Sequence, residues 1–438
     1  MDNQQQNKPD QGLKNIWVMA TIFLVIVLII GGVVYFLPNK KPLLKLLSNR
    51  NKPSVADDTG ATPTGINSVV KANNQFALNL YSQLKNKPGN IFFSPYSIST
   101  ALSMVYEGAR GQTAKEMQSV FNFPKDDQIR RSSFASIYNQ FNKPSSKYKL
   151  SVANALWAEK SYHFLKSYLE TVKKYYGGKA TNLDFVHSTE LSRQTINHWV
   201  EDKTNNKIKN LLPAGSLNSM TRLVLTNAIY FKGDWLKQFK KSQTTNEDFH
   251  LSPTKTIKIP MMRRTDEEAK FNYAENDKWQ ALEMPYKGKK LSMIVLLPKR
   301  HNLSELESSL SLEEIDNLKN KFKKQRVGVF MPKFTFNTKY LMNDTLSQMG
   351  MPTAFSNQAD FSGTDGTQNL FISKVIHQAF IKVDEEGTEA AAATGVVMDK
   401  AVMASNIFRV DHPFIFLIQD KENGEILFLG RIVNPNIG

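Results

Sequence analysis

Residues 383–400 read VDEEGTEAAAATGVVMDK, and they separate two apolar segments that have the pattern of strands, VIHQAFIKV (375–383) and HPFIFLIQD (412–420). The acidic residues around Gly387 are typical of an exposed turn. The residues from Ala390 to Gly395 have almost no side chain to bury. The stretch is too apolar for an ordinary solvated loop and too featureless for a core, so its role has to come from the rest of the chain.

Composition places the chain among globular proteins with a basic surface. Of its 438 residues, 41% are hydrophobic and 22% are charged, as in ordinary folded domains. The absence of cysteine excludes disulfides, thiolate metal sites and a cysteine nucleophile. The formal net charge of +16 could attract polyanions. The lysines are scattered, however, as in NKFKKQR (320–326), which favours simple solvation of the surface over a polyanion site.

The N-terminal region contains a long uncharged segment at 16–37, IWVMATIFLVIVLIIGGVVYFL. About 20 such residues span the hydrocarbon core of a bilayer, and Trp17 and Tyr35 lie where aromatic rings favour the interface. A cleaved signal peptide would have a shorter apolar region and a small-residue cleavage site. We therefore expect an uncleaved transmembrane anchor at 16–37, a tail at 1–15 and a flexible linker at 38–66.

The orientation of this anchor is open on charge alone. Lys8 and Lys14 precede the segment, whereas five basic residues follow it within 40–52. Counting these charges places the C-terminal side in the cytoplasm, but large domains that follow a span often translocate regardless of such charges.

From about Asn67 the chain mixes helical and strand patterns. SPYSISTALSMVYEGA (94–109) has a typical helix start, with Ser94 as N-cap and Pro95 at the first position. Strand patterns occur at 150–159, 221–231, 291–298 and 327–336, and helical patterns at 167–177 and 191–208. No internal repeat and no regular alternation of strand and helix appears, which favours a mixed α+β domain.

Catalytic and metal-binding templates are absent. The chain has no GxxxxGK[ST] phosphate loop, no GxGxxG after a strand, no HExxH and no GxSxG. No two histidines have helical ligand spacing, and they are dispersed as His163, His187, His198, His250, His301, His377 and His412. We therefore expect no enzyme, no cofactor and no metal site.

Several longer stretches, in the order in which they occur, resemble the serpin family from about Asn67 to the C-terminus. No single one is decisive, but their joint presence in order is highly specific. They are NIFFSPYSISTALSMVYEGARGQTAKEM (90–117), INHWVEDKTNNKIKNLL (196–212), LVLTNAIYFKGDW (223–235), MPKFTF (331–336), FSNQADFSG (355–363), EEGTEAAAAT (385–394), FRVDHPFIFLI (408–418) and FLGRIVNP (428–435).

The resemblance implies a serpin domain at 67–438. Its fold would be α+β, with a large and mostly antiparallel central sheet, two smaller sheets, about eight to nine helices and an exposed reactive-centre loop. The opening stretch would then be bait. A protease that attacks it becomes acylated, and the N-terminal part of the loop inserts as a new central strand. The attached protease is thereby carried to the far pole and distorted. Strand addition and released strain of this kind are known physical mechanisms.

The hinge of this loop has residues that suit insertion. Gly387 allows unusual backbone angles at a pivot, and small side chains meet little resistance between packed strands. Strand alternation would place Thr388 on one face and Glu389 on the other. Non-inhibitory relatives tend to break this hinge with bulky or charged residues, so an inhibitor is favoured over a binding or chaperone-like serpin. The hinge residues are Glu385, Glu386, Gly387, Thr388, Glu389, Ala390, Ala391, Ala392 and Ala393.

The resemblance also assigns two groups of residues around the sheet. The first matches the region where the sheet opens, and consists of Ser94, Ser97, Asn227 and His377. The second matches the top of the sheet, where insertion starts, and consists of Trp235, Lys333 and Glu385. Lys333 and Glu385 could form an ion pair that holds the hinge. Both groups could also serve only to stabilise the core.

The position of the reactive bond follows from the same resemblance. In the family the attacked residue usually lies sixteen residues beyond the hinge glutamate, which is Glu385 here. Counting places the bond between Ala401 and Val402, which suits elastase-like or subtilisin-like proteases. The alternative, between Lys400 and Ala401, suits a trypsin-like protease.

Together these patterns predict a membrane-anchored, monomeric, suicide-type inhibitor of serine proteases. Papain-like cysteine proteases are further candidate targets. A polyanion is a candidate ligand because of the net charge, but no specific sequence motif supports it. An inhibitory role favours an extracytoplasmic domain, against the charge count.

Overall fold

The computed structural model describes residues 55–142, 145, 147–388 and 406–436. The compact unit begins at Val55, within the stretch 38–66 that was predicted as a linker. Ala56 is buried, and its backbone N–H and carbonyl both hydrogen-bond to the side-chain amide of Asn139, at 2.9 and 2.8 Å. The folded domain therefore starts before Asn67, because these residues already pack against it.

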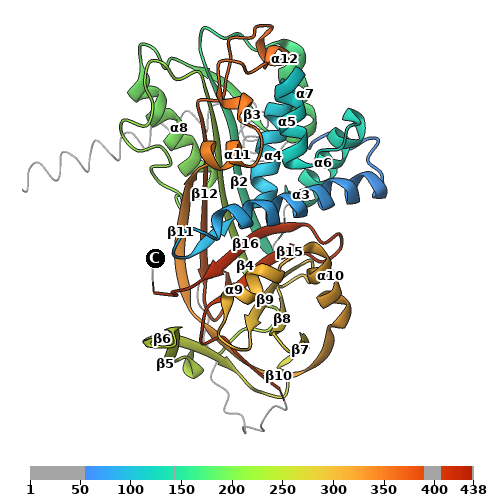
Figure 1. Cartoon of the computed structure of the whole chain (residues 1–438), viewed down its shortest axis with the longest axis vertical. Coiled ribbons are helices and arrows are strands. Elements are labelled where there is room, and N and C mark those ends of the chain that lie inside the picture. The colour runs from blue at the N-terminus through green and yellow to red at the C-terminus, as the bar shows by residue number, and fades with distance from the viewer. Residues whose placement is uncertain (1–54, 143–144, 146, 389–405, 437–438) are drawn as a thin grey trace, which may run out of the picture. The chain divides into compact units, whose positions relative to one another are not determined.

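The described residues contain ten α-helices, slightly more than the eight to nine that the resemblance implied. Figure 1 shows α4, α5, α6 and α7 grouped on one side of the long strands, with α8 on the other side. The helices are α3 (Pro63–Leu84), α4 (Pro95–Tyr106), α5 (Gly111–Phe121), α6 (Asp127–Asn142), α7 (Lys166–Tyr176), α8 (Thr189–Lys203), α9 (Leu303–Ser309), α10 (Leu312–Lys321), α11 (Asn343–Gln348) and α12 (Ser362–Asp365).

Sixteen strands accompany these helices in the described residues. They are β1 (Ile91–Phe93), β2 (Tyr148–Glu159), β3 (Lys179–Leu183), β4 (Leu223–Asp234), β5 (Thr245–Ser252), β6 (Lys255–Arg264), β7 (Lys270–Glu275), β8 (Trp279–Pro285), β9 (Leu291–Pro298), β10 (Lys323–Pro332), β11 (Phe334–Leu341), β12 (Lys374–Val383), β13 (Gly387–Thr388), β14 (Asn406–Arg409), β15 (Phe414–Asp420) and β16 (Ile426–Ile432). The mixture confirms the α+β class.

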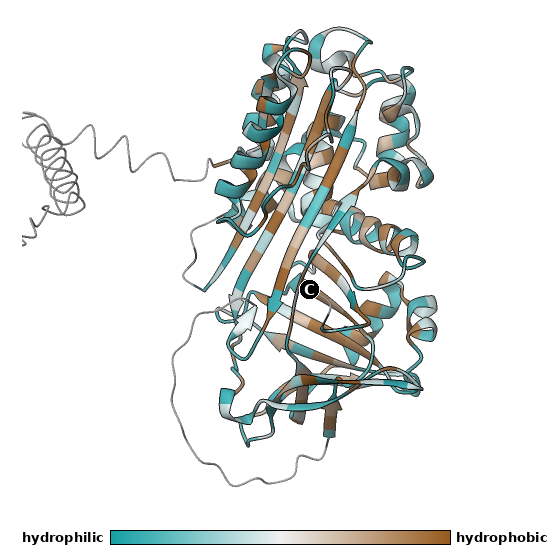
Figure 2. Cartoon of the chain, turned by 90° about the vertical axis from the view of Figure 1, so that its left-hand side faces the viewer, coloured by the Kyte–Doolittle hydropathy of each residue, from teal (hydrophilic) through white to brown (hydrophobic). Residues whose placement is uncertain are grey.

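The long strands form a six-stranded sheet in the order β11-β12-β13-β4-β2-β3. Hydrophobic residues recur along its strands (Figure 2), and strand alternation buries residues on both of its faces. On β2, Leu156 and Ala158 belong to the main core that α4 covers, whereas Ala155 and Trp157 point to a second core under α8. Both faces of these strands are packed against other side chains. A strand that enters this sheet must therefore displace the side chains of its new neighbours.

The remaining strands form a ten-stranded sheet in the order β1-β16-β15-β9-β8-β7-β10-β6-β5, with β14 paired to β10. The first half of β10 pairs with β7 and its second half with β6 and β14. The two smaller sheets that the resemblance implied are therefore joined through β10.

The segment 327–336, predicted as a single strand, is two strands with a break at Lys333. Before the break the chain pairs with β6 in the ten-stranded sheet, and after it with β12 in the six-stranded sheet. Lys333 thus lies where the chain passes from one sheet to the other, next to the C-terminal end of β12.

No helix among the described residues has the length and apolarity needed to cross a bilayer. This finding contradicts the localisation predicted above, a single-pass membrane protein with an extracytoplasmic domain, and that prediction is dropped. The finding concerns only the part of the chain that the structure describes. The segment 16–37, predicted as the anchor, lies outside it.

Candidate functional site

In the six-stranded sheet, the short strand β13 lies between β4 and β12 at one end of these strands. Over most of their length, β4 and β12 are parallel neighbours, joined across seven residue pairs from Val224 with Lys374 to Tyr230 with Phe380. Beyond these pairs the two strands are separated by β13, which is antiparallel to both. The hinge that follows β12 therefore turns back and enters the sheet.

Gly387 makes a close backbone approach at this entry. It pairs with Asp234 on β4, and an added Cβ would lie 2.1 Å from the carbonyl oxygen of Gly233. Its φ is not in the left-handed region, so the unusual backbone angle expected from the sequence is not the reason for glycine here. The reason is space, because any side chain would collide with β4.

Thr388 is the last described residue of the hinge, and its side chain is buried. Its hydroxyl lies 2.8 Å from the hydroxyl of Tyr286, which is also buried. Tyr286 stacks in turn on Trp235, with ring centroids 4.6 Å apart. The Thr388 side chain thus faces the core and already has a polar partner there.

Glu385 is held by three residues from two connections of the fold, Phe239 and Thr244 between β4 and β5 and Lys333 between β10 and β11. Its carboxylate lies 2.9 Å from Nζ of Lys333 and accepts a hydrogen bond of 2.7 Å from Thr244. Its carbonyl accepts from the backbone N–H of Phe239. Burial opposes ionisation of Glu385, but the bonds from Thr244 and Lys333 outweigh it and hold the pKa of Glu385 below its ordinary value. The ion pair that the sequence suggested is present.

Trp235 fixes the turn between β12 and β13. Its indole N–H donates to the carbonyl of Asp384 at 3.0 Å, and its backbone N–H donates to the carbonyl of Glu386 at 2.8 Å. The Asp384 carboxylate accepts from the backbone N–H groups of Glu386 and Gly387. This turn places Trp235, Lys333 and Glu385 together at the point of entry.

A buried polar cluster lies where β4 and β12 are direct neighbours, away from β13. His377 on β12, Asn227 on β4 and Asn154 on β2 are side by side in register across adjacent strands. Ser97 joins them from α4, since its hydroxyl accepts from the Asn227 amide at 2.5 Å and donates to Asn154 at 3.2 Å. Ser94 caps α4 by accepting from the Ser97 N–H, and its own hydroxyl donates to the carbonyl of Leu427.

The hydrogen bonds of His377 determine its tautomer. The backbone N–H of Ser94 donates to Nε2 at 3.1 Å, so Nε2 carries no proton, and Nδ1–H donates to the side-chain oxygen of Asn227. Burial lowers the pKa of His377 to about 3. A neutral histidine therefore bridges α4, β4 and β12, as expected for a hydrogen-bonded core residue.

Four participants were missed by sequence reasoning. Asp384 and Thr244 contact the hinge, Tyr286 binds Thr388, and Asn154 completes the buried cluster. Asn154 had a local signal, because it is an amide within the apolar strand pattern 150–159. Asp384 directly precedes the hinge in the sequence, whereas Thr244 and Tyr286 become its neighbours only through the fold.

Part of the predicted site belongs to residues that the structure does not describe. Glu389 and Ala390 to Ala393 of the hinge, and both candidate reactive bonds at Lys400, Ala401 and Val402, lie outside the described residues. The described residues Ser94, Ser97, Asn227 and His377 form one cluster, and Trp235, Lys333 and Glu385 another, as reported above.

Comparison with known proteins agrees with this architecture. The family model described as Serpin (serine protease inhibitor) matches residues 71–435. An uncharacterized serpin-like protein of Thermococcus kodakarensis is 42% identical over 95% of this chain and 99% of its own length. The human leukocyte elastase inhibitor is 41% identical over 84% of this chain and 99% of its own length.

Solved structures show the same likeness. Uncleaved ovalbumin superposes with a TM-score of 0.77 at 33% identity, covering 84% of this chain and all of ovalbumin (100%). Serpin48 of the insect Tenebrio molitor gives 0.76 at 33% identity, covering 84% of this chain and 98% of its own. The family is one of protease inhibitors rather than of enzymes. The chain described here belongs to the serpin family of serine protease inhibitors.

Proposed function

We propose that this serpin traps serine proteases by a suicide mechanism, in which the loop is cleaved and then inserted between β4 and β12. One observation supports this above all others. β13 already occupies the first positions of the insertion path, paired with β12 at Val383 and with β4 at Gly233 and Asp234.

The pairing of the sheet supplies a driving force for further insertion. β4 and β12 are now parallel neighbours, a pairing that is slightly less stable per residue than an antiparallel one. A strand that continues β13 between them would break this single parallel ladder and make two antiparallel ladders. The backbone therefore gains hydrogen bonds as the loop enters, which is the energetics of strand addition.

Extending the register of β13 shows which residues would meet. Thr388 pairs with Val383 and Gly233, so each later residue would lie opposite one residue earlier on both β12 and β4. Ala390 and Ala392 would then share the core-facing side of Thr388. Thr394 would arrive between His377 and Asn227, where its hydroxyl can join the buried cluster.

This register also explains the small residues of the hinge. The positions opposite Ala390 are Ile381 and Phe231, both buried in the main core. A methyl group can enter between such neighbours with little repacking, whereas a large side chain would overpack the core. Glu389 would lie on the opposite face, away from the main core.

The target class follows from the proposed reactive bond. A small residue at Ala401 suits a protease with a small specificity pocket, and the human relative at 41% identity is named for inhibition of leukocyte elastase. We therefore place elastase-like enzymes first, subtilisin-like enzymes second, and trypsin-like enzymes at Lys400 third. Papain-like cysteine proteases complete the set to be tested.

A direct test is to incubate the full-length chain with each of these proteases and to look for an adduct that survives boiling in detergent. The released C-terminal peptide should begin at Val402, or at Ala401 if Lys400 is attacked. The same protease with its nucleophile removed should give no adduct. Melting should also shift to higher temperature after cleavage, because the inserted strand stabilises the sheet.

The alternative serpin, one that only binds ligands, predicts a different result. Its loop would be cut without an adduct and without a rise in melting temperature. That outcome with all four classes of protease would refute the proposed function.

A further inference from the structure

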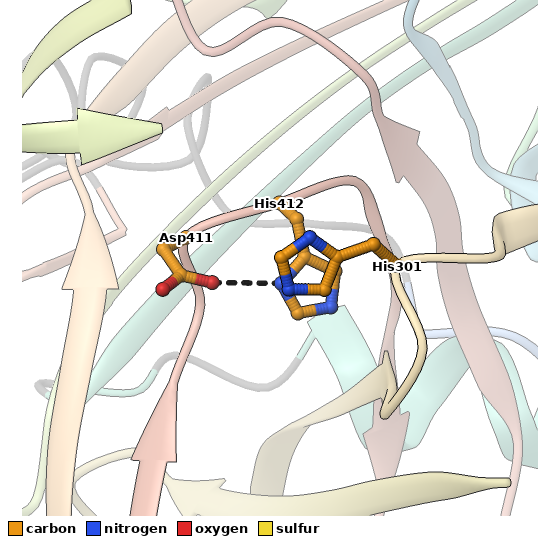
Figure 3. A group of neighbouring side chains, drawn as sticks. All are labelled: His301, Asp411 and His412. Carbon is orange, nitrogen blue, oxygen red and sulfur yellow. Dashed lines mark hydrogen bonds and ion pairs between the residues drawn. The ribbon is translucent and has the colours of Figure 1, made fainter. Parts of the chain in front are cut away.

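Three side chains with metal-binding groups meet outside the hinge and the buried polar cluster (Figure 3). His301 lies in the connection between β9 and α9, and Asp411 and His412 lie between β14 and β15. One ligand atom from each residue can be chosen so that all three lie within 4.8 Å of one another. The sequence suggested no metal site, because 110 positions separate His301 from Asp411 and no local spacing connects them.

His412 has a hydrogen-bond acceptor at both ring nitrogens. Nε2 lies 2.6 Å from the carbonyl oxygen of Pro298, and Nδ1 lies 2.7 Å from a carboxylate oxygen of Asp411. The carbonyl can only accept, so Nε2 must carry a hydrogen. The lone pair of Nδ1 would then face the carboxylate, and only a proton or a cation between them makes this contact favourable.

This arrangement is the one that metal-binding histidines usually have. A liganding imidazole donates its other N–H to a carboxylate or to a backbone carbonyl, which fixes its tautomer and the orientation of its ring. The carbonyl of Pro298, at the end of β9, does this for Nε2 of His412 and leaves Nδ1 directed at Asp411. Because His412 is buried, its orientation is held by the surrounding fold.

His301 contributes an imidazole from the solvent side. Its ring stacks on that of His412, with centroids 3.8 Å apart and planes at 15°, and the residue is exposed. Its backbone has a φ of +55°, which is unusual for a residue with a side chain.

Asp411 supplies the negative charge. Its backbone carbonyl accepts from the N–H of His250 on β5 at 2.7 Å, which fixes the position of the residue. The carboxylate is therefore held in place beside the two imidazoles.

We propose that His301, Asp411 and His412 form a binding site for a divalent transition-metal ion, with Zn²⁺ as the ion that best fits the ligands. Two imidazoles and a carboxylate are a common three-residue set for zinc, with a fourth position left to water. Zinc bonds of about 2.0–2.2 Å require the ligand atoms to approach each other slightly. The exposed ring of His301 can turn from its stacked position to meet the ion.

Such an ion would cross-link two connections of the fold. Asp411 and His412 follow β14, which is the first described strand after residues 389–405 and is paired only with β10 among the described strands. His301 belongs to the connection that follows β9. The metal would therefore fasten the chain just beyond the loop to the body of the domain, independently of any protease.

Binding can be tested with the metal alone. We expect Zn²⁺ to raise the melting temperature of the full-length chain and EDTA to reverse the rise. Titration followed by calorimetry should give one tight site per chain, and Co²⁺ in its place should produce the visible absorption of a low-symmetry site with nitrogen and oxygen ligands. None of these measurements depends on inhibition, so failure here would leave the proposed function unaffected.

The decisive variant is His301→Ala, because this residue is exposed and its loss should not disturb the fold. We expect zinc affinity to fall by about tenfold or more and the cobalt spectrum to disappear. His198→Ala is the matched control, since His198 lies on α8 with its side chain 82% exposed. Asp411→Asn should weaken binding as well. Equal zinc affinity in His301→Ala, His198→Ala and the unchanged chain, or no binding in any of them, would overturn the proposal.

Discussion

The hydroxyl groups of Thr388 and Tyr286 lie 2.8 Å apart in the core, although 102 positions separate the residues in the chain. Tyr286 follows β8 of the ten-stranded sheet, whereas Thr388 is the last described residue of the strand that has entered the six-stranded sheet. Burial raises the pKa of Tyr286, so the phenol stays protonated and can share a hydrogen with Thr388. The hinge is thus held by a residue of the other sheet.

Thr388→Arg should convert the inhibitor into a substrate. An arginine at this position would bring its charge into the core beside the Tyr286 hydroxyl, and burial of an unpaired charge typically costs several kcal/mol. The hinge should therefore stay outside the sheet, and insertion should be too slow to compete with hydrolysis of the acyl-enzyme. We expect cleavage at a similar initial rate without an adduct, measured by denaturing gel electrophoresis.

Thr388→Val is the control for this change. Valine keeps the shape and the strand preference of threonine but loses the hydroxyl that meets Tyr286. It should still form the adduct, with a modest loss of thermal stability. If Thr388→Arg traps protease with unchanged stoichiometry, insertion through this hinge is not the mechanism.

Gly387→Ala should expel β13 from its place between β4 and β12. The new methyl group would lie 2.1 Å from the carbonyl oxygen of Gly233, and overpacking of this kind typically costs about 1–3 kcal/mol. The contact of Trp235 with the hinge turn would change as well, so we expect a lower melting temperature and altered tryptophan fluorescence. Unchanged stability and fluorescence would show that the close approach at Gly387 is not required.

The native state should become less stable as the pH decreases, because of His377. Its pKa is lowered to about 3 in the fold, whereas an unfolded histidine titrates near 6.5. Between these values the unfolded chain binds a proton that the folded chain does not, so stability is present above pH 6.5 and is lost as pH falls. From pH 7 to pH 5 this single group should cost about 2 kcal/mol.

His377→Gln isolates that effect from the other titrating groups. A glutamine amide can donate to Asn227 and accept from the Ser94 N–H, but it does not titrate. Denaturant unfolding of both proteins at several pH values should show that their difference in stability shrinks from pH 7 to pH 5. Parallel pH curves would assign the acid sensitivity to groups other than His377.

Lys333→Met should destabilise the entry to the sheet. Methionine keeps much of the apolar stem, but Glu385, only 3% exposed, would lose its ion-pair partner. Because Lys333 itself is partly exposed, we expect a loss of about 1–2 kcal/mol. Lys160→Met is the matched control, since its partner Asp184 is more exposed, and it should cost less than about 1 kcal/mol. Equal losses of unfolding free energy in the two variants would mean that the hinge ion pair stabilises the fold no more than the exposed ion pair does.

Much of the fold is predictable from local sequence, because the patterns that indicate helices and strands depend on residues close together in the chain. The strand 291–298 and the helix that starts after Ser94 were both predicted within a few residues, since apolar periodicity and capping depend only on near neighbours. The hinge is recognisable for the same reason, as a run of small residues after Gly387. Local pattern could not show that the segment 327–336 breaks at Lys333, because the break reflects a change of sheet rather than a change of composition.

Tertiary structure alone decides which distant residues meet. Asn154 and His377 become neighbours of Asn227 only when β2, β4 and β12 pair in one particular register, and a shift by one residue would turn each side chain to the other face. His301 and His412 carry no mutual signal in the sequence, yet their rings stack in the folded chain. The physical reason is that propensity and periodicity act over a few residues, whereas hydrogen bonds, ion pairs and metal ligands require contacts that only the packing of the whole domain creates.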